Sequence, residues 1–227
     1  MPRADVVFLL DVDNTLLDND RVISDLRQFL ERAIGPEGQE RYWQIFQTLW
    51  AELGYADYLG ALQRYRVESP HDVNLFKVSL FLTDYPFADR LFPASLDVIE
   101  HLRQWGPVVI LSDGDVVFQP RKVERSGLLE AVEGRALIYV HKEQELADVE
   151  RRHPADRYVA VDDKLRLLAA MKEHWQERVT TVFPRQGQYA HDPRALAQFP
   201  PADLTIERIG DLLELGRDAL LEAGRGN

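Results

Sequence analysis

Short apolar runs recur along the chain and predict strands. They are largely unbroken and rich in β-branched residues, which is typical of parallel strands covered by helices on both faces. The runs span residues 6–10, 108–111, 136–140, 158–161 and 179–183. Between the later runs, apolar residues recur at helical spacing and predict helices over residues 96–105, 121–129, 143–152 and 164–175. Strand and helix therefore alternate from about residue 92 onward, which predicts an α/β fold with a doubly wound parallel sheet.

Residues 18–92 interrupt this alternation. They show helical periodicity and many aromatic residues, but no strand pattern. Helices are predicted over residues 25–33 and 41–53, separated by the Gly-Pro-Glu-Gly sequence at residues 35–38. We therefore predict a core domain formed by residues 1–17 and 93–227, with a helical domain of residues 18–92 inserted after the first strand. A last helix is predicted over residues 209–223.

Composition narrows the classes of partner. With 27 Lys and Arg against 38 Asp and Glu, the 227-residue chain carries a formal net charge of −11, which repels nucleic acid and anionic lipid. The absence of Cys excludes disulfides, thiolate catalysis and Cys-ligated metals. No early apolar run approaches the roughly 18 residues of a membrane span. We expect a cytoplasmic protein that binds neither nucleic acid nor membranes, while its oligomeric state stays open.

Polar side chains that can bind phosphate or a metal follow four of the five predicted strands. Any one of them alone would more often be a turn or helix-capping residue. Ligands of open parallel sheets bind beyond the carboxyl ends of the strands, so we expect the four groups to converge on one crevice. The groups are Asp11 with Asp13, Ser112 with Asp113, Lys142, and Asp162 with Asp163.

This ordered set resembles the haloacid dehalogenase-like (HAD) superfamily. The first motif of that family is a hydrophobic strand followed by Asp-x-Asp-x-Thr, and here residues 8–17 read Phe-Leu-Leu-Asp-Val-Asp-Asn-Thr-Leu-Leu. A Ser after the second strand, a Lys after the third and an acidic pair after the fourth complete the match, which spans residues 8–164. The resemblance implies a Rossmann-like HAD core of the phosphatase type, with residues 18–92 as a helical type 1 cap.

The resemblance assigns the two acids of the first motif to covalent and acid/base chemistry. Asp11 would attack phosphorus and form an aspartyl-phosphate, which divides one difficult hydrolysis into two displacements. Asp13 would protonate the leaving oxygen and then deprotonate the attacking water. Family members that cleave carbon–halogen bonds lack the second acid, so Asp13 favours a phosphatase over a dehalogenase.

The second and third motifs would bind the transferring phosphoryl group. By resemblance, Ser112 donates a hydrogen bond to a phosphoryl oxygen together with the backbone N–H of Asp113 or Gly114. Lys142 would neutralise charge on both the nucleophile and the phosphoryl group. Lys122 competes for this lysine role, but its place inside a predicted helix favours a solvated surface position, so we prefer Lys142.

A carboxylate that attacks a phosphate dianion needs a cation between the two, and Mg²⁺ suits carboxylate and carbonyl oxygens. By resemblance, the ligands are the Asp11 side chain, the Asp13 backbone carbonyl and Asp163, with Asp162 in direct or water-mediated support. Many family members carry a further Asp a few residues later, whereas Lys164 and apolar residues follow here. This departure leaves the division of roles between Asp162 and Asp163 open.

The predicted function is a magnesium-dependent phosphatase that acts on a small phosphorylated metabolite. A phosphotransferase or phosphomutase would use the same residues, and a phospho-ligand-binding regulator could keep the fold without turnover. In the insert, Trp43, Phe46 and Trp50 share one helical face, which favours internal packing over a substrate-stacking surface. The loop of residues 185–191 is expected to border the crevice.

Overall fold

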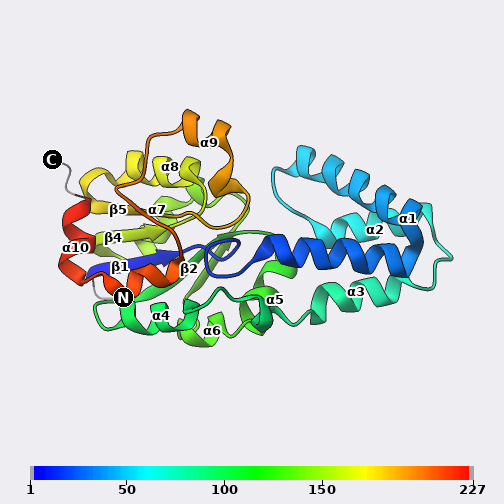
Figure 1. Ribbon diagram of the computed structural model, residues 1–227, viewed down its shortest axis with the longest axis horizontal. Coiled ribbons are helices and arrows are strands. Elements are labelled where there is room, and N and C mark those ends of the chain that lie inside the picture. Colours follow the sequence, from blue (N-terminus) through cyan, green and yellow to red (C-terminus); the bar gives the residue numbers. More distant parts are fainter. Residues whose placement is uncertain (1–2, 225–227) are drawn as a thin grey trace.

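The computed structural model describes residues 3–224 and contains one six-stranded sheet (Figure 1). All neighbouring strands are parallel, in the order β3-β2-β1-β4-β5-β6. The predicted fold class is thereby confirmed, and the strands are β1 Ala4–Leu10, β2 Val108–Asp113, β3 Ala136–Tyr139, β4 Ala155–Val161, β5 Val179–Pro184 and β6 Leu204–Ile206. The sequence pattern missed β6, because three residues are too few to establish a strand pattern.

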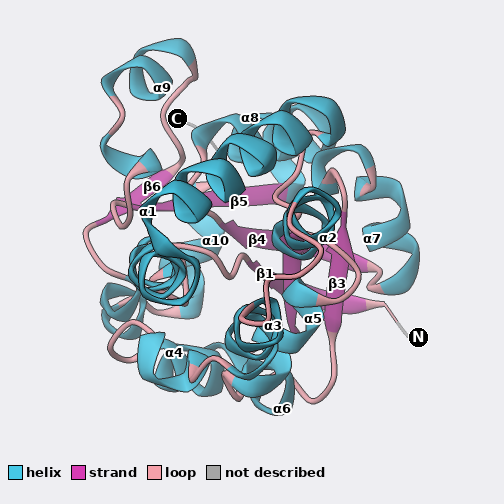
Figure 2. Ribbon diagram, turned by 90° about the vertical axis from the view of Figure 1, so that its right-hand side faces the viewer, coloured by secondary structure: helices cyan, strands magenta, loops and turns pink. Residues whose placement is uncertain are grey.

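Helices cover both faces of the sheet, and the side chains of β1 explain why (Figure 2). Val6, Phe8 and Leu10 point into one apolar cluster, and Val7 and Leu9 point into another. All five are at most 1% exposed, as expected of a central parallel strand. The first cluster lies against α4 Ser95–Arg103, α5 Phe118–Arg125, α6 Leu128–Ala131 and α10 Arg217–Ala223, and the second against α7 Leu146–Arg152 and α8 Leu165–Trp175.

The order of the strands reverses at β1. From β1 the chain adds β2 and β3 on one side, then returns to place β4, β5 and β6 on the other. Leu10 is paired with Ile110 of β2 and with Val161 of β4, so the carboxyl ends of these three strands lie together. Such a reversal point is where open parallel sheets bind their ligands.

Three helices follow β1 and extend beyond the end of the sheet (Figure 1). They are α1 Asn19–Leu53, α2 Tyr58–Glu68 and α3 Leu75–Asp84, and a 3₁₀ helix at Phe87–Arg90 follows them. The long α1 is kinked at Gly35, whose φ of 78° and ψ of 169° are not helical, and Pro36 comes next. The predicted break is thus present, although the first helical segment begins earlier than expected because Asp18 caps it by accepting from the N–H of Arg21.

The chain enters and leaves this helical region through two adjacent segments, residues 16–18 and 90–92. The Asp18 N–H donates to the Arg90 carbonyl at 2.8 Å, and the Phe92 N–H donates to the Leu16 carbonyl at 2.9 Å. The hydroxyl of Ser95, at the start of α4, donates to the same Leu16 carbonyl at 2.7 Å. These bonds make the two segments a paired connection between the helices and the sheet.

Two predicted helices are divided by glycines. The helix expected over residues 121–129 is two helices, since α5 ends at Arg125 and Gly127, with a φ of 84°, precedes α6. The tail expected as one helix is a 3₁₀ helix, Ile209–Glu214, followed by α10, with extended Gly216 between them. Short 3₁₀ helices at Lys142–Gln144, Gln176–Arg178 and Tyr189–His191, and α9 Pro193–Gln198, complete the fold. Within residues 3–224, no helix has the length and apolarity needed to cross a membrane.

Candidate active site

The loop after β1 curls tightly and brings the two acids of the first motif to the reversal point. The Asp11 N–H donates to the Val161 carbonyl of β4 at 3.0 Å, so Asp11 still belongs to the sheet. The chain then turns around the Val12 carbonyl, which accepts the N–H groups of Thr15, Leu16 and Leu17 at 2.9 to 3.3 Å. Asp11 is buried, whereas the Asp13 side chain is 26% exposed.

Asn14 stabilises this curl with a left-handed backbone, at a φ of 61°, which Asn tolerates better than most residues. Its side-chain amide donates to Asp20 at 3.1 Å, and its amide oxygen accepts the Asp20 N–H at 3.2 Å. Gly187 lies against it so closely that a Cβ there would be 2.5 Å from the Asn14 Cβ. The loop after β5 therefore needs glycine at this point.

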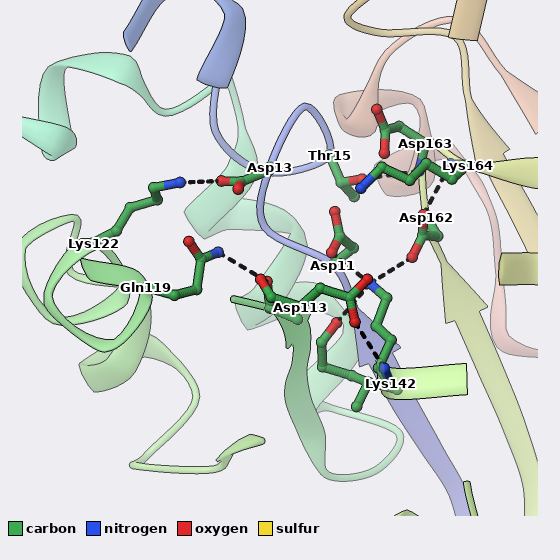
Figure 3. A network of polar contacts seen from close by, with 12 residues as sticks. Asp11, Asp13, Thr15, Asp113, Gln119, Lys122, Lys142, Asp162, Asp163 and Lys164 are labelled. Atoms are coloured by element: carbon green, nitrogen blue, oxygen red, sulfur yellow. Dashed lines mark hydrogen bonds and ion pairs between the residues drawn. The ribbon is translucent and has the colours of Figure 1, made fainter. Parts of the chain in front are cut away.

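Lys142 lies under the site and joins three strand ends (Figure 3). Its Nζ is 2.5 Å from Asp11 Oδ1, 2.6 Å from Asp162 Oδ2 and 3.0 Å from the Leu111 carbonyl. Burial alone would lower the pKa of Lys142, but the charges of Asp11, Asp162 and Asp113 outweigh it and raise the pKa. The raised pKa favours the charged ammonium beside Asp11.

Three buried carboxylates meet beside this lysine. Asp11, Asp162 and Asp163 each offer an oxygen, and these oxygens lie within 4.8 Å of one another. Asp11 Oδ2 and both oxygens of Asp163 are buried and accept no hydrogen bond. Burial raises the pKa of Asp163 well above its ordinary value, and burial raises that of Asp162 to about 6. Unpaired buried carboxylate oxygens are costly, and a hard divalent cation such as Mg²⁺ fits this all-oxygen donor set.

The two acids after β4 differ in their partners. Asp162 is already engaged, since Oδ2 pairs with Lys142 and Oδ1 accepts the Lys164 N–H at 2.9 Å. Asp163 is positioned only through its backbone, whose N–H donates to the Thr15 hydroxyl at 3.1 Å. This difference favours Asp163 over Asp162 as the direct metal ligand.

Lys164, which departs from the family pattern in sequence, lies beside the acids of the site (Figure 3). Burial lowers its pKa, but Asp163, Asp11 and Asp162 together raise it. With Lys142, it places two cationic side chains beside the three carboxyl groups. Its position directly after the acidic pair at a strand end was the available signal.

The structure connects Ser112 to a residue that the sequence did not single out. Gln119 of α5 donates its amide to the Ser112 hydroxyl oxygen at 2.9 Å, and both residues are buried. The Asp113 carboxylate accepts the Lys142 N–H at 2.7 Å and so positions the third motif. The Gly114 N–H donates to the Tyr139 carbonyl at 2.9 Å, within the ladder between β2 and β3. Of the two predicted backbone donors, Gly114 is therefore already occupied, which leaves Asp113.

The expectation that Lys122 lies on a solvated helix face is wrong. Lys122 is 1% exposed, and its Nζ lies 2.6 Å from Asp13 Oδ1 and 3.0 Å from Asn19 Oδ1 (Figure 3). The reason is that α5 begins at Phe118, so Lys122 falls one turn later on the same buried stripe. That i, i+4 spacing from a large aromatic residue was the missed signal. Lys142 contacts the nucleophile and Lys122 contacts the second acid.

A cavity of about 770 Å³ adjoins these groups, and Asp13, Gly114 and Lys164 are among its lining residues. Trp43, Phe46 and Trp50 of α1 also line it. The prediction of internal packing holds for Trp43 and Phe46, whose ring centroids are 5.2 Å apart, but Trp50 is 53% exposed. From the loop of residues 185–191, Gln188 and Tyr189 reach the cavity, as expected of a loop bordering the crevice.

Comparisons with solved structures recover the same architecture. A haloacid dehalogenase-like hydrolase of Burkholderia xenovorans LB400 is 62% identical, with a TM-score of 0.89, over 94% of this chain and 99% of that one. A haloacid dehalogenase-like family hydrolase of Xanthomonas campestris is 17% identical, with a TM-score of 0.65, over 99% of this chain and 95% of that one. The L-2-haloacid dehalogenase of Xanthobacter autotrophicus, 19% identical, has a TM-score of 0.58 over 93% and 98% of the two chains.

The structures from Xanthomonas campestris and Xanthobacter autotrophicus are less than 25% identical to this chain, so their similarity shows the fold alone. No curated protein sequence matches the chain significantly. The family model for haloacid dehalogenase-like hydrolases matches residues 6–181, which include Asp11, Lys142 and the acidic pair Asp162 and Asp163. The chain therefore belongs to the haloacid dehalogenase-like hydrolase family.

Proposed function

We propose that this protein is a magnesium-dependent phosphatase that hydrolyses a small-molecule phosphomonoester through an aspartyl-phosphate. The observation that carries the proposal is the unpaired, buried carboxylate of Asp163, which faces Asp11 and Asp162 within 4.8 Å. The carboxylates of Asp11 and Asp163 and the Asp13 carbonyl would hold the Mg²⁺. When bound, the cation would reduce the repulsion between the Asp11 carboxylate and a dianionic phosphate.

The chain's own residues supply the remaining chemistry. An Asp11 oxygen forms a bond to phosphorus while the ester P–O bond breaks, and Asp13 gives its proton to the leaving alkoxide. Water then attacks the phosphorus of the acyl phosphate, gives a proton to Asp13 and releases inorganic phosphate, which regenerates the Asp11 carboxylate. Lys142 holds the Asp11 side chain in place through its ion pair at 2.5 Å.

Asp13 supports a phosphatase in preference to a dehalogenase. A halide leaves as a stable anion and needs no proton, whereas an alkoxide must be protonated as it leaves. Asp13 lines the cavity with a partly exposed carboxylate, in the position to serve such a leaving group. A regulator that only binds a phosphorylated ligand would need neither this acid nor the nucleophile.

Phosphate release from a panel of phosphorylated metabolites, with Mg²⁺ and with EDTA, tests the proposal. We expect activity that depends on Mg²⁺ and that falls at least about a thousandfold in Asp11→Asn, since the amide cannot attack phosphorus. Asp5→Asn is the matched control, because Asp5 lies on the same strand with an 85% exposed side chain. Release of chloride from L-2-chloropropionate without release of phosphate from any ester would refute the proposal. Phosphate transfer that needs an acceptor sugar would identify a phosphotransferase instead.

The role of Asp13 has its own test. As general acid, it matters most for a poor leaving group, so Asp13→Ala should lose more activity on an alkyl phosphate than on p-nitrophenyl phosphate. As general base, it also serves the second step, so the variant should release a burst of one nitrophenol per enzyme before a slow steady state. Equal losses on both substrates without a burst would remove the acid/base role.

A further inference from the structure

The wall of the active-site cavity is strongly aromatic. Nine of its 28 lining residues are Phe, Trp or Tyr, whereas aromatic residues make up 10% of the chain. They come from both sides, with Trp50 of α1 and Tyr55 on the side of the inserted helices, and Tyr189 and Phe199 on the side of the sheet. Since Asp13 and Lys164 line the same cavity, this wall is continuous with the reacting centre.

Internal packing accounts for only part of this wall. Phe46 stacks on Tyr58 at 4.7 Å between ring centroids, and Tyr58 lies 5.0 Å from Phe118, so these rings cover one another. Trp50 is 53% exposed and, within residues 3–224, has no aromatic partner; Tyr189 is 43% exposed. Large apolar rings left open inside a cavity are typical of ligand-binding surfaces.

The size of the cavity leaves room for a drug-sized ligand. At about 770 Å³, it lies in the upper part of the roughly 300–1,000 Å³ range of pockets for drug-sized molecules. A two- or three-carbon phosphate held at Asp13 would leave most of the aromatic wall in contact with water. The wall and the volume together suit a ligand with a large apolar part attached to its anionic end.

We propose that the substrate carries an aromatic ring in its leaving group and that Trp50 is the main specificity-determining contact for this ring. The ring stacks against the aromatic wall while the phosphoryl group lies at Asp11 and Asp13. The inference rests on the proposed phosphatase function for its kinetic test, and a binding experiment tests it separately.

Three alkyl phosphates isolate the contribution of the ring. Propyl phosphate, 3-cyclohexylpropyl phosphate and 3-phenylpropyl phosphate all release a primary alkoxide, so their chemical steps are alike. We expect kcat/KM for the phenyl compound to exceed that for propyl phosphate by at least about tenfold, with the cyclohexyl compound between them. Equal values for all three would overturn the inference and leave the phosphatase function intact. A cyclohexyl compound that equals the phenyl compound would overturn its aromatic part.

The Trp50→Ala variant tests whether the aromatic ring of the substrate contacts Trp50. The variant should lower the phenyl-to-propyl ratio of kcat/KM at least about fivefold. Phe76→Ala is the matched control, because Phe76 is a 69% exposed ring on α3 that does not line the cavity. An equal loss on both substrates in Trp50→Ala, or the same change in ratio in Phe76→Ala, would refute the assignment of Trp50.

Phosphonates test the binding without turnover, because their carbon–phosphorus bond is not hydrolysed. Calorimetric titration of the Mg²⁺-loaded wild-type protein with 3-phenylpropylphosphonate and propylphosphonate should give at least tenfold tighter binding of the phenyl compound, and Trp50→Ala should remove the difference. If no phosphate ester is hydrolysed but this preference is found, the proposed function fails and the aromatic specificity stands. If esters are hydrolysed without this preference, the phosphatase function stands and the aromatic specificity fails.

Discussion

Replacing Asp163 by Asn is expected to make the metal-free protein more stable and insensitive to Mg²⁺. Both carboxylate oxygens of Asp163 are buried without a hydrogen-bond partner, and Asp11 and Asp162 add two negative charges nearby. Burial holds the pKa of this carboxyl well above its ordinary value, which shows that the folded state disfavours the charged form. Asn has almost the same shape and carries no charge, so the substitution removes the unfavourable term and the metal ligand together.

The expected gain in the free energy of unfolding follows from the burial of the Asp163 carboxylate. An unsatisfied buried polar group costs about 1–3 kcal/mol, and Lys164 offsets part of the charge here, so we expect a gain of about 1–2 kcal/mol for the metal-free variant. For a chain of this size, that gain corresponds to a rise in Tm of about 2–8 °C. In the wild type, Mg²⁺ at one hundred times its Kd should add about 2.7 kcal/mol, and the variant should lose this response.

Differential scanning calorimetry in EDTA and at increasing Mg²⁺ concentrations measures both effects. Asp5→Asn, which changes an exposed acid at the opposite end of β1, should melt like the wild type under every condition. A Tm of Asp163→Asn at or below the wild-type value in EDTA would show that the carboxylate is satisfied in the metal-free protein. A Tm of the variant that still rises with Mg²⁺ would place the direct ligand elsewhere.

Four other substitutions test buried and partly buried polar groups by urea denaturation. Asp13→Ala should cost about 1–3 kcal/mol because it leaves buried Lys122 without its ion pair, whereas Lys122→Met should cost less, since Asp13 can be hydrated; the opposite ranking would contradict this account. His153 is buried and its pKa is lowered by burial, so its contribution to stability is complete above the unfolded pKa of about 6.5 and is lost as the pH falls below it. Between pH 7.5 and 5.5, the free energy of unfolding of His153→Gln should therefore fall by up to about 1 kcal/mol less than that of the wild type. Equal falls in the two proteins would show that His153 does not cause this pH dependence. Asp203→Ala should cost about 1.5–3 kcal/mol, because Asp203 holds Lys172 at 2.8 Å and also accepts the Thr181 N–H and hydroxyl; a loss below 0.5 kcal/mol would show that water replaces these bonds.

Much of the sheet could be predicted because its strands are buried on both faces. The run at residues 6–10 has no polar residue to mark an exposed side, and such a run has few alternatives to a central parallel strand. The short β6 could not be predicted, since its register is set by pairing Val182 with Leu204, a tertiary contact. The division of the tail at Gly216 also depends on packing, because the helical spacing of apolar residues continues across it.

The site could be predicted where a residue follows a strand, because strand ends of a parallel sheet must meet. Asp11, Lys142 and Asp163 are of this kind. Lys122 could not be placed in this way, since it comes from a helix whose rotation about its axis determines whether the side chain faces the solvent or Asp13.

The central position of β1 has a consequence for synthesis of the chain. This strand is made before the other strands of the sheet, and it can pair with β2 on one edge once residue 113 has been added, but its other edge must wait for β4 at residues 155–161. At about 5–20 residues per second, that delay is on the order of 10–30 s. Throughout it, the uncharged segment Val6–Leu10 has an unpaired edge of the kind that joins strands of other chains. The central position that buries the nucleophile therefore also leaves an apolar strand edge open while the chain is being made.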